Sequence, residues 1–262
     1  MNLDIYTEEM TKSLWDKAFF MDKIPGAKCV IDFGCADGAL MTLLGKLFPS
    51  VDFFGYDIND ELLKRAIDRI SQCPANVKSV YNAEGMTGLI SRIKRNYTPD
   101  QICINFSSVL HEVFSSSPSG KAAIKRLITE LKPKYITIRD MYFYEAPAPT
   151  HQYVQGPNPD WDEMKPYREA FEAVYGPIKD NAKNCLHFLM KYQWKNNGWD
   201  TELNENYFSW TIDEFKHLIG WNNYDIVFEN HYQLPYLIEL WKHRFFRPNL
   251  HTHAQFILRR ND

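Results

Sequence analysis

The stretch "KCVIDFGCADGALMTLLGKLF", residues 28–48, decides the fold that this sequence predicts. Its first part, residues 29–33, is a short apolar run rich in β-formers, which predicts a buried strand. From Ala39 onward, leucines recur at helical spacing and predict an amphipathic helix. Between the two lies a tight turn of small residues, Gly34, Ala36 and Gly38. This order of strand, turn and helix lets a ligand approach the backbone of the turn closely.

The class of ligand follows from what this turn lacks. A phosphate-binding loop would contain GxxxxGK[ST], whose lysine is missing here. A dinucleotide site would contain GxGxxG, whose bare amide groups receive a pyrophosphate. The spacing here is Gly34-x-Ala36-x-Gly38, and the carboxylate of Asp37 stands where it would repel an anion. The turn therefore suits a ligand with cationic or hydroxyl groups better than a polyphosphate.

A second acidic residue narrows the choice of ligand. The segment "DFFGYDIN", residues 52–59, predicts another strand, and Asp57 near its end lies nineteen residues after Gly38. An acidic side chain at this point can accept hydrogen bonds from both hydroxyls of a ribose. A ligand with a ribose and an ammonium group, but without phosphates, matches S-adenosylmethionine.

The two stretches "VIDFGCADG" and "FFGYDIN" resemble motifs one and two of the class I S-adenosylmethionine-dependent methyltransferases. The resemblance extends from about residue 28 to 141 and is weaker at the C-terminus. The alternative is an ordinary strand, turn and helix of another doubly wound protein, which would not account for the placed aspartates. The resemblance implies S-adenosyl-L-methionine as cofactor and transfer of its methyl group to an acceptor.

The resemblance also implies roles for individual residues. Asp32 and Gly34 would contact the methionine end of the cofactor, and Ile58 would pack on the adenine. Glu84 would stand near the adenine amino group, where the family commonly has Asp or Asn. The cofactor-binding residues predicted in this way are Asp32, Gly34, Cys35, Ala36, Asp37, Gly38, Asp57, Ile58, Glu84, Phe106 and Ser107.

The regular alternation of strands and helices predicts a parallel sheet. Strands are expected at 29–33, 52–59, 77–83, 135–141, 224–233 and 253–260, with one more in 101–114 that continues into a loop. Helices are expected at 7–22, 60–72, 85–97, 121–133 and 211–220. The final two strands would pair antiparallel at the end of the sheet, by resemblance to the family. The expected fold is Rossmann-like, with a seven-stranded, mostly parallel sheet and helices on both faces.

Two insertions interrupt this alternation in what is expected to be one domain, residues 1–262. Residues 142–210 are rich in proline and aromatic residues and predict a helical lid, with helices near 162–174 and 181–195. The second insertion, about 234–252, contains basic and aromatic residues mixed at 235–248. Those residues suit either an amphipathic helix packed on the core or a grip on nucleic acid.

Composition restricts the partners and the compartment. The net charge of −3 and pI near 6.2 give no overall attraction to nucleic acid or anionic membranes. Apolar runs are far shorter than a membrane span, and the acidic N-terminus is unlike a signal peptide. The five cysteines include no CxxC pair and are expected to be reduced, so we expect a cytoplasmic protein. The sequence contains no signal for an oligomeric state.

Candidate residues for the transfer follow the fourth and fifth strands. Methyl transfer needs alignment of the nucleophile, and a base only when the nucleophile carries a proton. His111 and Glu112 are the predicted catalytic pair, a base oriented by a carboxylate, although His111 packed over the cofactor is the alternative. The residues predicted to contact the acceptor are Asp140, Tyr142, Tyr144 and Tyr153. No metal site is expected, because the His251 and His253 pair has no nearby cysteine cluster.

Three functions agree with this sequence. The first is methylation of an O, N or C nucleophile of a small molecule, by in-line attack on the sulfonium. The second is methylation of RNA or another nucleic acid, gripped by residues 235–248; the [DN]PP[YF] pattern of base-amino methylation is missing. The third is a non-catalytic binding or activator protein that keeps the fold.

Overall fold

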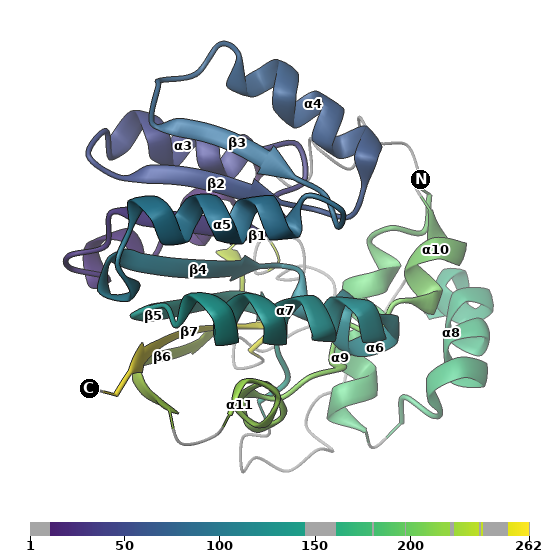
Figure 1. The fold of residues 1–262 in the computed structure, drawn as a ribbon. Helices are drawn as coiled ribbons and strands as arrows, with labels where there is room; N and C mark the ends of the chain where they lie inside the picture. Colours follow the sequence, from purple (N-terminus) through teal and green to yellow (C-terminus); the bar gives the residue numbers. More distant parts are fainter. Residues whose placement is uncertain are drawn as a thin grey trace.

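The computed structural model describes residues 11–144, 161–179, 181–196, 198–220, 223–235, 237 and 251–261. Seven strands form one sheet in the order β3-β2-β1-β4-β5-β7-β6 (Figure 1). The strands are β1 Cys29–Phe33, β2 Asp52–Tyr56, β3 Val77–Tyr81, β4 Ile102–Ser107, β5 Tyr135–Met141, β6 Tyr224–Tyr232 and β7 His253–Arg260. The first five run parallel, and β7 is antiparallel to both of its neighbours. The expected seven-stranded, mostly parallel sheet is confirmed.

The central strand β1 is buried along its whole length because helices cover both faces of the sheet. Its side chains alternate between two hydrophobic clusters, as the two-residue period of a strand requires. Ile31 and Phe33 pack into one cluster and Val30 into the other. β1 therefore explains why the opening stretch reads as a continuous apolar run.

The helices divide between the two faces of the sheet. The cluster that contains Val30 also contains apolar residues of α3 Ala39–Leu47, of α4 Asp60–Ile70 and of the N-terminal segment. The opposite cluster contains residues of α5 Met86–Asn96, α7 Pro118–Leu131 and α11 Ile212–Ile219. Capping residues fix where several of these helices begin. Thr211 Oγ1 accepts a hydrogen bond from the Glu214 amide at 3.2 Å and so starts α11, as the sequence predicts.

Three helices after β5 form a hydrophobic cluster of their own. They are α8 Trp161–Tyr175, α9 Ala182–Tyr192 and α10 Trp199–Asn204. Figure 1 shows them together at one side of the sheet, beside α6 Leu110–Ser116. The described part of the predicted insertion at 142–210 is therefore mainly helical, and most of its aromatic residues pack against one another.

Two predicted elements differ from the observed ones. Of the helix expected at 7–22, residues 7–10 lie outside the described residues, and from residue 11 onward the chain is interrupted, with helix at Thr11, α2 Leu14–Lys17 and the 3₁₀ turn η1 Met21–Lys23. The loop expected after the fourth strand is α6, because Asp140 on β5 accepts hydrogen bonds from the first amides of that helix. A cap supplied by a distant strand leaves no local signal in the sequence.

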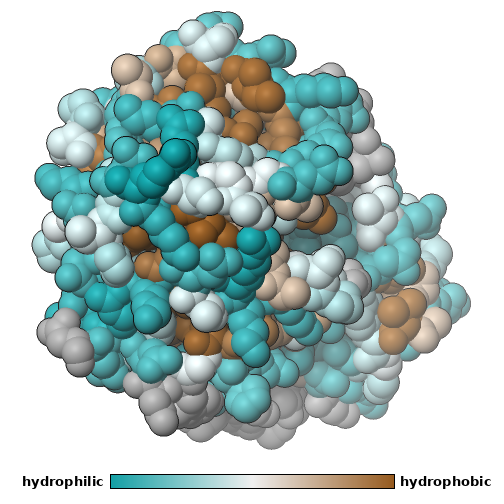
Figure 2. All heavy atoms as spheres, viewed as in Figure 1, coloured by the Kyte–Doolittle hydropathy of each residue, from teal (hydrophilic) through white to brown (hydrophobic). Residues whose placement is uncertain are grey.

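The surface in the view of Figure 2 is mostly hydrophilic, with hydrophobic side chains in separate groups. Exposed apolar side chains on or beside α4 include Ile58 and Ile67. Among the described helices, none is both long enough and apolar enough to span a membrane.

Candidate active site

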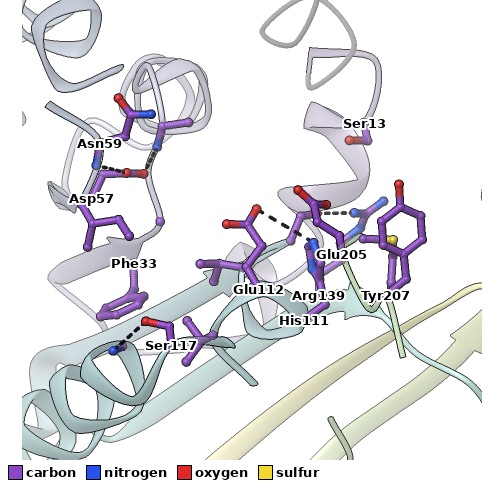
Figure 3. A pocket seen from close by; sticks show the side chains of 18 of the residues that line it. Ser13, Phe33, Asp57, Asn59, His111, Glu112, Ser117, Arg139, Glu205 and Tyr207 are labelled. Carbon is purple, nitrogen blue, oxygen red and sulfur yellow. Dashed lines mark hydrogen bonds and ion pairs between the residues drawn. The ribbon is translucent and has the colours of Figure 1, made fainter. Parts of the chain in front are cut away.

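A cavity of about 400 Å³ opens at the carboxyl ends of the parallel strands. One wall comes from the turns after β1 and β2 and includes Gly34, Ala36 and Asp57. Another comes from α6 and includes His111 and Glu112. The third comes from the helical insertion and includes Trp194, Glu202, Glu205 and Tyr207. Figure 3 shows several of these side chains converging on the cavity.

The turn after β1 depends on glycine at its first position. Gly34 has φ +79°, and a Cβ atom there would lie 2.6 Å from Val109 Cγ2. The amides of Gly34 and Cys35 both donate to the carbonyl of Tyr56, at 2.7 and 3.1 Å, which ties the turn to β2. Ala36 also adopts a left-handed conformation, with φ +47°. The turn is thus held open toward the cavity by backbone geometry that few side chains allow.

Asp57 joins this turn to the end of β2. Its Oδ2 accepts from the Ala36 amide at 2.8 Å and its Oδ1 from the Asn59 amide at 2.9 Å. Burial raises the pKa of this carboxyl, and the backbone donors only partly oppose the rise. Each carboxylate oxygen can accept a further hydrogen bond, so Asp57 is placed to bind two hydroxyl groups in the cavity.

Asp32 lies one layer deeper, in a row of polar side chains across three strands. Asn105 Nδ2 donates to Asp32 Oδ1 at 2.8 Å, and Thr137 Oγ1 donates to Asn105 Oδ1 at 2.9 Å. Burial raises the pKa of Asp32 to about 6. Burial likewise lowers the pKa of the neighbouring Lys17 to about 7. Asp32, Lys17 and Ser107 line a separate small cavity of about 30 Å³.

Asp37 and Cys35 are placed differently from Asp57. Asp37 forms an ion pair with Arg69 of α4, and Arg69 Nε also donates to the Asp37 carbonyl at 3.0 Å. The Cys35 side chain is buried beneath the turn, and burial raises the pKa of its thiol. Both residues line the small cavity and not the large one. Their side chains support the turn, while Gly34 and Ala36 border the large cavity.

His111 and Asp140 form a buried pair below the opposite wall. His111 Nδ1 donates to Asp140 Oδ1 at 2.7 Å, and Asp140 Oδ2 accepts from the Leu110 amide at 2.6 Å. Burial alone would lower the pKa of His111, but the charges of Asp140 and Glu112 outweigh it and raise the pKa to about 9. Burial raises the pKa of Asp140, yet the His111 charge and hydrogen bonds dominate and lower it. The carboxylate that orients His111 is therefore Asp140 and not its neighbour in sequence.

Glu112 faces the cavity from the same helix. Its Oε1 lies 3.9 Å from His111 Nε2, and half of its side chain is exposed. Desolvation by the cavity walls raises the pKa of Glu112 to about 7, although the His111 charge opposes this rise. A carboxyl group with this pKa exchanges protons near neutral pH.

The acidic wall of the insertion was not predicted from sequence. Glu202 and Glu205 line the cavity beside Glu112, and the Tyr207 hydroxyl donates to the Glu202 carboxylate. Burial and the Glu205 charge raise the pKa of Glu202 to about 7. Lys191 donates to the carbonyls of Glu202 and Glu205, which fixes this segment on α9. The available signal was the acidic and aromatic run "WDTELNENY" at 199–207.

Several residues predicted for the cofactor lie at different depths. Ile58 lines the large cavity and is 70% exposed. Phe106 is fully buried between Phe33 and Phe215, so its side chain belongs to the core. Ser107 borders the small cavity. Glu84 is exposed and outside the residues that line either cavity, because the chain turns toward α5 at this point.

The aromatic residues predicted for the acceptor are placed away from the cavity. Tyr142 packs edge-on against Trp210, and Tyr144 lies 4.4 Å from the His231 ring between ring centroids. Neither lines the cavity, because both follow β5 toward β6 and α11 and not toward α6. Asp140 also lies behind His111 and does not line it. Tyr153 and most of residues 235–248 lie outside the described residues.

Comparison with known proteins is consistent with this architecture. Neither protein-family models nor curated proteins give a match. Among solved structures, the plantazolicin methyltransferase BamL, crystallised with a desmethylPZN analog and SAH, is 12% identical and has a TM-score of 0.50, with 96% of this chain and 84% of that chain covered. TnmH is 9% identical with a TM-score of 0.51, covering 97% of this chain and 57% of that one. The magnesium protoporphyrin IX methyltransferase of Synechocystis PCC 6803 is 11% identical, with a TM-score of 0.49 and coverage of 98% and 86%.

Proposed function

We propose that this chain, whose fold is that of the class I S-adenosylmethionine-dependent methyltransferases, transfers a methyl group from S-adenosylmethionine to a small molecule. The observation that carries the proposal is Asp57. Its two oxygens bind the backbone at Ala36 and Asn59 and keep acceptor capacity toward the cavity. A carboxylate at the end of the second strand, beside a bare turn after the first, fits a ribose without phosphates.

The residues around the cavity fit this cofactor. Asp57 would hold the ribose hydroxyls, Ile58 would cover one face of the adenine, and the turn from Gly34 to Ala36 would border the methionine part. When bound, the cofactor supplies a methyl group already activated on a sulfonium. The chain's own task is then to place the acceptor, exclude water and remove a proton where the acceptor carries one.

Glu112 is the better candidate for that proton transfer. The pKa of His111, raised to about 9 by Asp140 and Glu112 against the effect of burial, keeps its ring protonated at neutral pH. The pKa of Glu112 is near 7, so its carboxylate is available and can also take up a proton. In this assignment, His111 acts as a fixed positive charge 3.9 Å from Glu112 that keeps part of the carboxylate ionised. The sequence analysis gave His111 either this base role or a place packed over the cofactor.

The acidic wall favours a small acceptor over a nucleic acid. Glu112, Glu202 and Glu205 border the same cavity, and a phosphate backbone entering it would meet three carboxylates. A cavity of about 400 Å³ is in the range of small-molecule sites. RNA methylation through residues 235–248 remains the second candidate, with the non-catalytic protein as the third.

Isothermal titration calorimetry with S-adenosylhomocysteine tests the core of the proposal. We expect the wild type to bind below millimolar concentration. Asp57→Ala should lose at least about tenfold in affinity, because it removes one or more hydrogen bonds to a charged group. Asp68→Ala, which removes an exposed carboxylate of α4, is the matched control and should bind like the wild type. Absence of binding by the wild type, or equal binding by Asp57→Ala, contradicts the proposal.

Transfer of labelled methyl groups separates the three functions. We expect incorporation into small amines or alcohols from a mixed panel, and none into transfer RNA. Incorporation into RNA with binding that weakens steeply between 50 and 200 mM salt would identify the second candidate. Cofactor binding without transfer to any member of the panel would identify the third.

A further inference from the structure

The carboxylate of Glu205 is a charged group without a partner in the wall of the large cavity. The backbone of this residue is fixed, because the Tyr175 hydroxyl donates to its carbonyl at 3.0 Å and Lys191 donates to the same carbonyl. The residue is half-buried, and its carboxylate forms no hydrogen bond or ion pair with any described residue. A carboxylate that is held on a fixed segment and left unpaired is a place to look for a ligand.

Glu202 presents a second free oxygen to the same cavity. Only 9% of the residue is exposed, and its Oε2 accepts a hydrogen bond from the Tyr207 hydroxyl. Its Oε1 has no partner among the described residues, yet it is not one of the fully buried, unpartnered polar atoms in that part of the chain. Because Glu202 borders the cavity, this oxygen opens onto it. The free oxygens of Glu202 and Glu205 therefore face ligand space and not packed protein.

Glu112 completes the acidic wall from the side of α6. Figure 3 shows Glu112 and Glu205 entering the cavity from α6 and from the end of α10. Burial raises the pKa of Glu112 to about 7 against the opposing charge of His111, and the Glu205 charge adds to this rise. His111 is paired with Asp140, and the other nearby cation, Lys191, is fully buried and does not line the cavity. An excess of negative charge therefore faces the cavity here.

The ligand that suits this wall is an organic cation. No three acidic, histidine or cysteine side chains of the described residues come together closely enough to hold a metal ion. Carboxylates spread around an open cavity instead suit an ammonium group, whose N–H donors point in different directions and reach separate acceptors. The apolar and aromatic side chains of Met190, Trp194 and Leu234 border the same cavity and suit the hydrocarbon part of such a ligand.

We propose that the methyl acceptor is an organic amine, which enters the cavity as an ammonium ion bound by Glu112, Glu202 and Glu205 and is methylated on its nitrogen. This inference rests on the proposed function and narrows the acceptor atom from O, N or C to nitrogen. An alcohol of the same shape would leave the three carboxylates unpaired, and a carboxylic acid would be repelled by them. The wall thus selects amines both by attraction and by exclusion.

One proton must leave the ammonium group before the transfer, because a protonated nitrogen has no lone pair. Glu112, the base of the proposed function, takes this proton as its carboxylate becomes a carboxylic acid. The freed lone pair of the amine then bonds to the methyl carbon, the electron pair of the old bond stays on sulfur, and the positive charge passes from sulfur to the methylated nitrogen. Glu202 and Glu205 lie beside the charge that returns to the nitrogen and stabilise it.

Titration calorimetry with the full chain, saturated with S-adenosylhomocysteine, measures this selectivity. The probes are pairs with the same carbon skeleton: butylamine and butanol, benzylamine and benzyl alcohol, phenethylamine and phenethyl alcohol. We expect the wild type to bind at least one amine about 10- to 100-fold more tightly than its matching alcohol, as expected for hydrogen bonds between charged groups. Transfer of labelled methyl groups from S-adenosylmethionine should give methylated amines and no methyl ethers.

Glu205→Gln isolates the contribution of the acidic wall. Because the Glu205 carboxylate has no partner among the described residues, the substitution removes a charge without breaking a contact of the fold. The preference for the amine should fall by about tenfold or more, while the affinity for S-adenosylhomocysteine changes by less than about twofold. Glu169→Gln, at an exposed glutamate of α8, is the matched control and should keep the preference. Glu205→Asp keeps the charge on a shorter side chain and should retain part of the preference; it replaces Glu205→Gln if melting shows that the latter does not fold.

The outcomes distinguish this inference from the proposed function. Failure of the wild type to bind S-adenosylhomocysteine contradicts the proposed function itself. If the wild type binds it but binds no amine more tightly than the matching alcohol, or methylates alcohols in place of amines, the amine assignment is overturned. A preference that survives unchanged in Glu205→Gln overturns the role of the acidic wall. If that variant instead loses affinity for S-adenosylhomocysteine as strongly as for the amine, the wall serves the cofactor and the inference is likewise overturned.

Discussion

The protonation of His111 provides a test of the site that needs no known acceptor. His111 is 5% exposed in its side chain, and three carboxylates act on it: Asp140 through a 2.7 Å hydrogen bond, Glu112 at 3.9 Å, and Glu205 at longer range. Burial lowers the pKa of His111, but these charges outweigh burial and raise it to about 9 from an ordinary value of 6.5. We expect His111→Gln to change the pH dependence of the free energy of unfolding.

The magnitude and sign follow from proton linkage. A pKa raised on folding from 6.5 to about 9 corresponds to about 3 kcal/mol of stability. This stability is fully present below about pH 6.5, because the folded chain then binds a proton more tightly than the unfolded chain. It is lost as the pH rises through about 9. The advantage of the wild type over His111→Gln should therefore shrink by about 3 kcal/mol between about pH 6 and about pH 9.5.

Urea unfolding followed by circular dichroism at several pH values measures this difference. Taking the difference between wild type and variant largely removes contributions of other groups that titrate in the same range, such as Lys17 and Lys191. His217→Gln on the exposed surface of α11 measures the effect of the same replacement outside the site. Proton NMR of the His111 ring gives the pKa directly. A ring that titrates at or below 6.5, or an advantage that stays constant with pH, would refute the reasoning and return His111 to the role of base.

Three further predictions concern Asp32 of β1 and two residues of the turn that follows it, Gly34 and Ala36. Gly34→Ala should lower the free energy of unfolding by about 2–4 kcal/mol, because its Cβ would lie 2.6 Å from Val109 Cγ2 at φ +79°; urea unfolding within 1 kcal/mol of the wild type would disprove the clash. Ala36→Gly should raise the free energy of unfolding by about 0.5–1 kcal/mol. The steric energy that alanine pays at φ +47° is larger than the extra conformational entropy that glycine loses on folding. Lys132→Gly, at the same φ outside the cavity, should do the same, and a loss in both would show that entropy dominates. Asp32→Asn should stabilise the protein by about 1–3 kcal/mol near pH 7.5, because burial raises the pKa of Asp32 to about 6. The wild type keeps its full stability below about pH 4 and loses part of it as Asp32 ionises above about pH 6. Equal gains from the substitution at about pH 4 and about pH 7.5 would contradict this cause.

The half of the site that the sequence predicted consists of local signals. The turn from Gly34 to Gly38 and the strand before Asp57 each occupy a few consecutive residues, so their patterns specify the fold and place Asp57 beside the turn. The parallel order of β1 to β5 then brings Gly34 and Asp57 to the same edge of the sheet. The strong local preferences and the global topology agree here, which is why the fold predicted from the sequence is confirmed.

The acceptor half depends on contacts that no local pattern contains. Asp140 accepts a hydrogen bond from the Leu110 amide at the start of α6, although it lies 30 positions later in the chain. The Ser209 hydroxyl, 98 positions after His111, donates to the His111 carbonyl. Aromatic content alone also misled the prediction for Tyr142, which packs against Trp210 in the core. Aromatic side chains that line a cavity and those that fill a core have the same composition, and only their partners distinguish them.

Three buried aspartates lie at the carboxyl edge of the sheet. The hydrogen bonds that each one accepts indicate whether it supports the structure or can bind a ligand. Asp140 accepts from backbone amides and from His111, its oxygens are saturated, and its pKa is lowered even though burial alone would raise it. Asp57 accepts from the Ala36 amide at Oδ2 and from the Asn59 amide at Oδ1, and burial leaves its pKa raised. Asp32 accepts from Asn105, and burial raises its pKa to about 6. A carboxylate that remains under-bonded in the folded chain costs stability, and a ligand with hydroxyl or ammonium donors reduces that cost when it binds. Asp57, which lines the large cavity, is therefore the aspartate suited to a ligand there, whereas Asp140, predicted from sequence to contact the acceptor, positions His111.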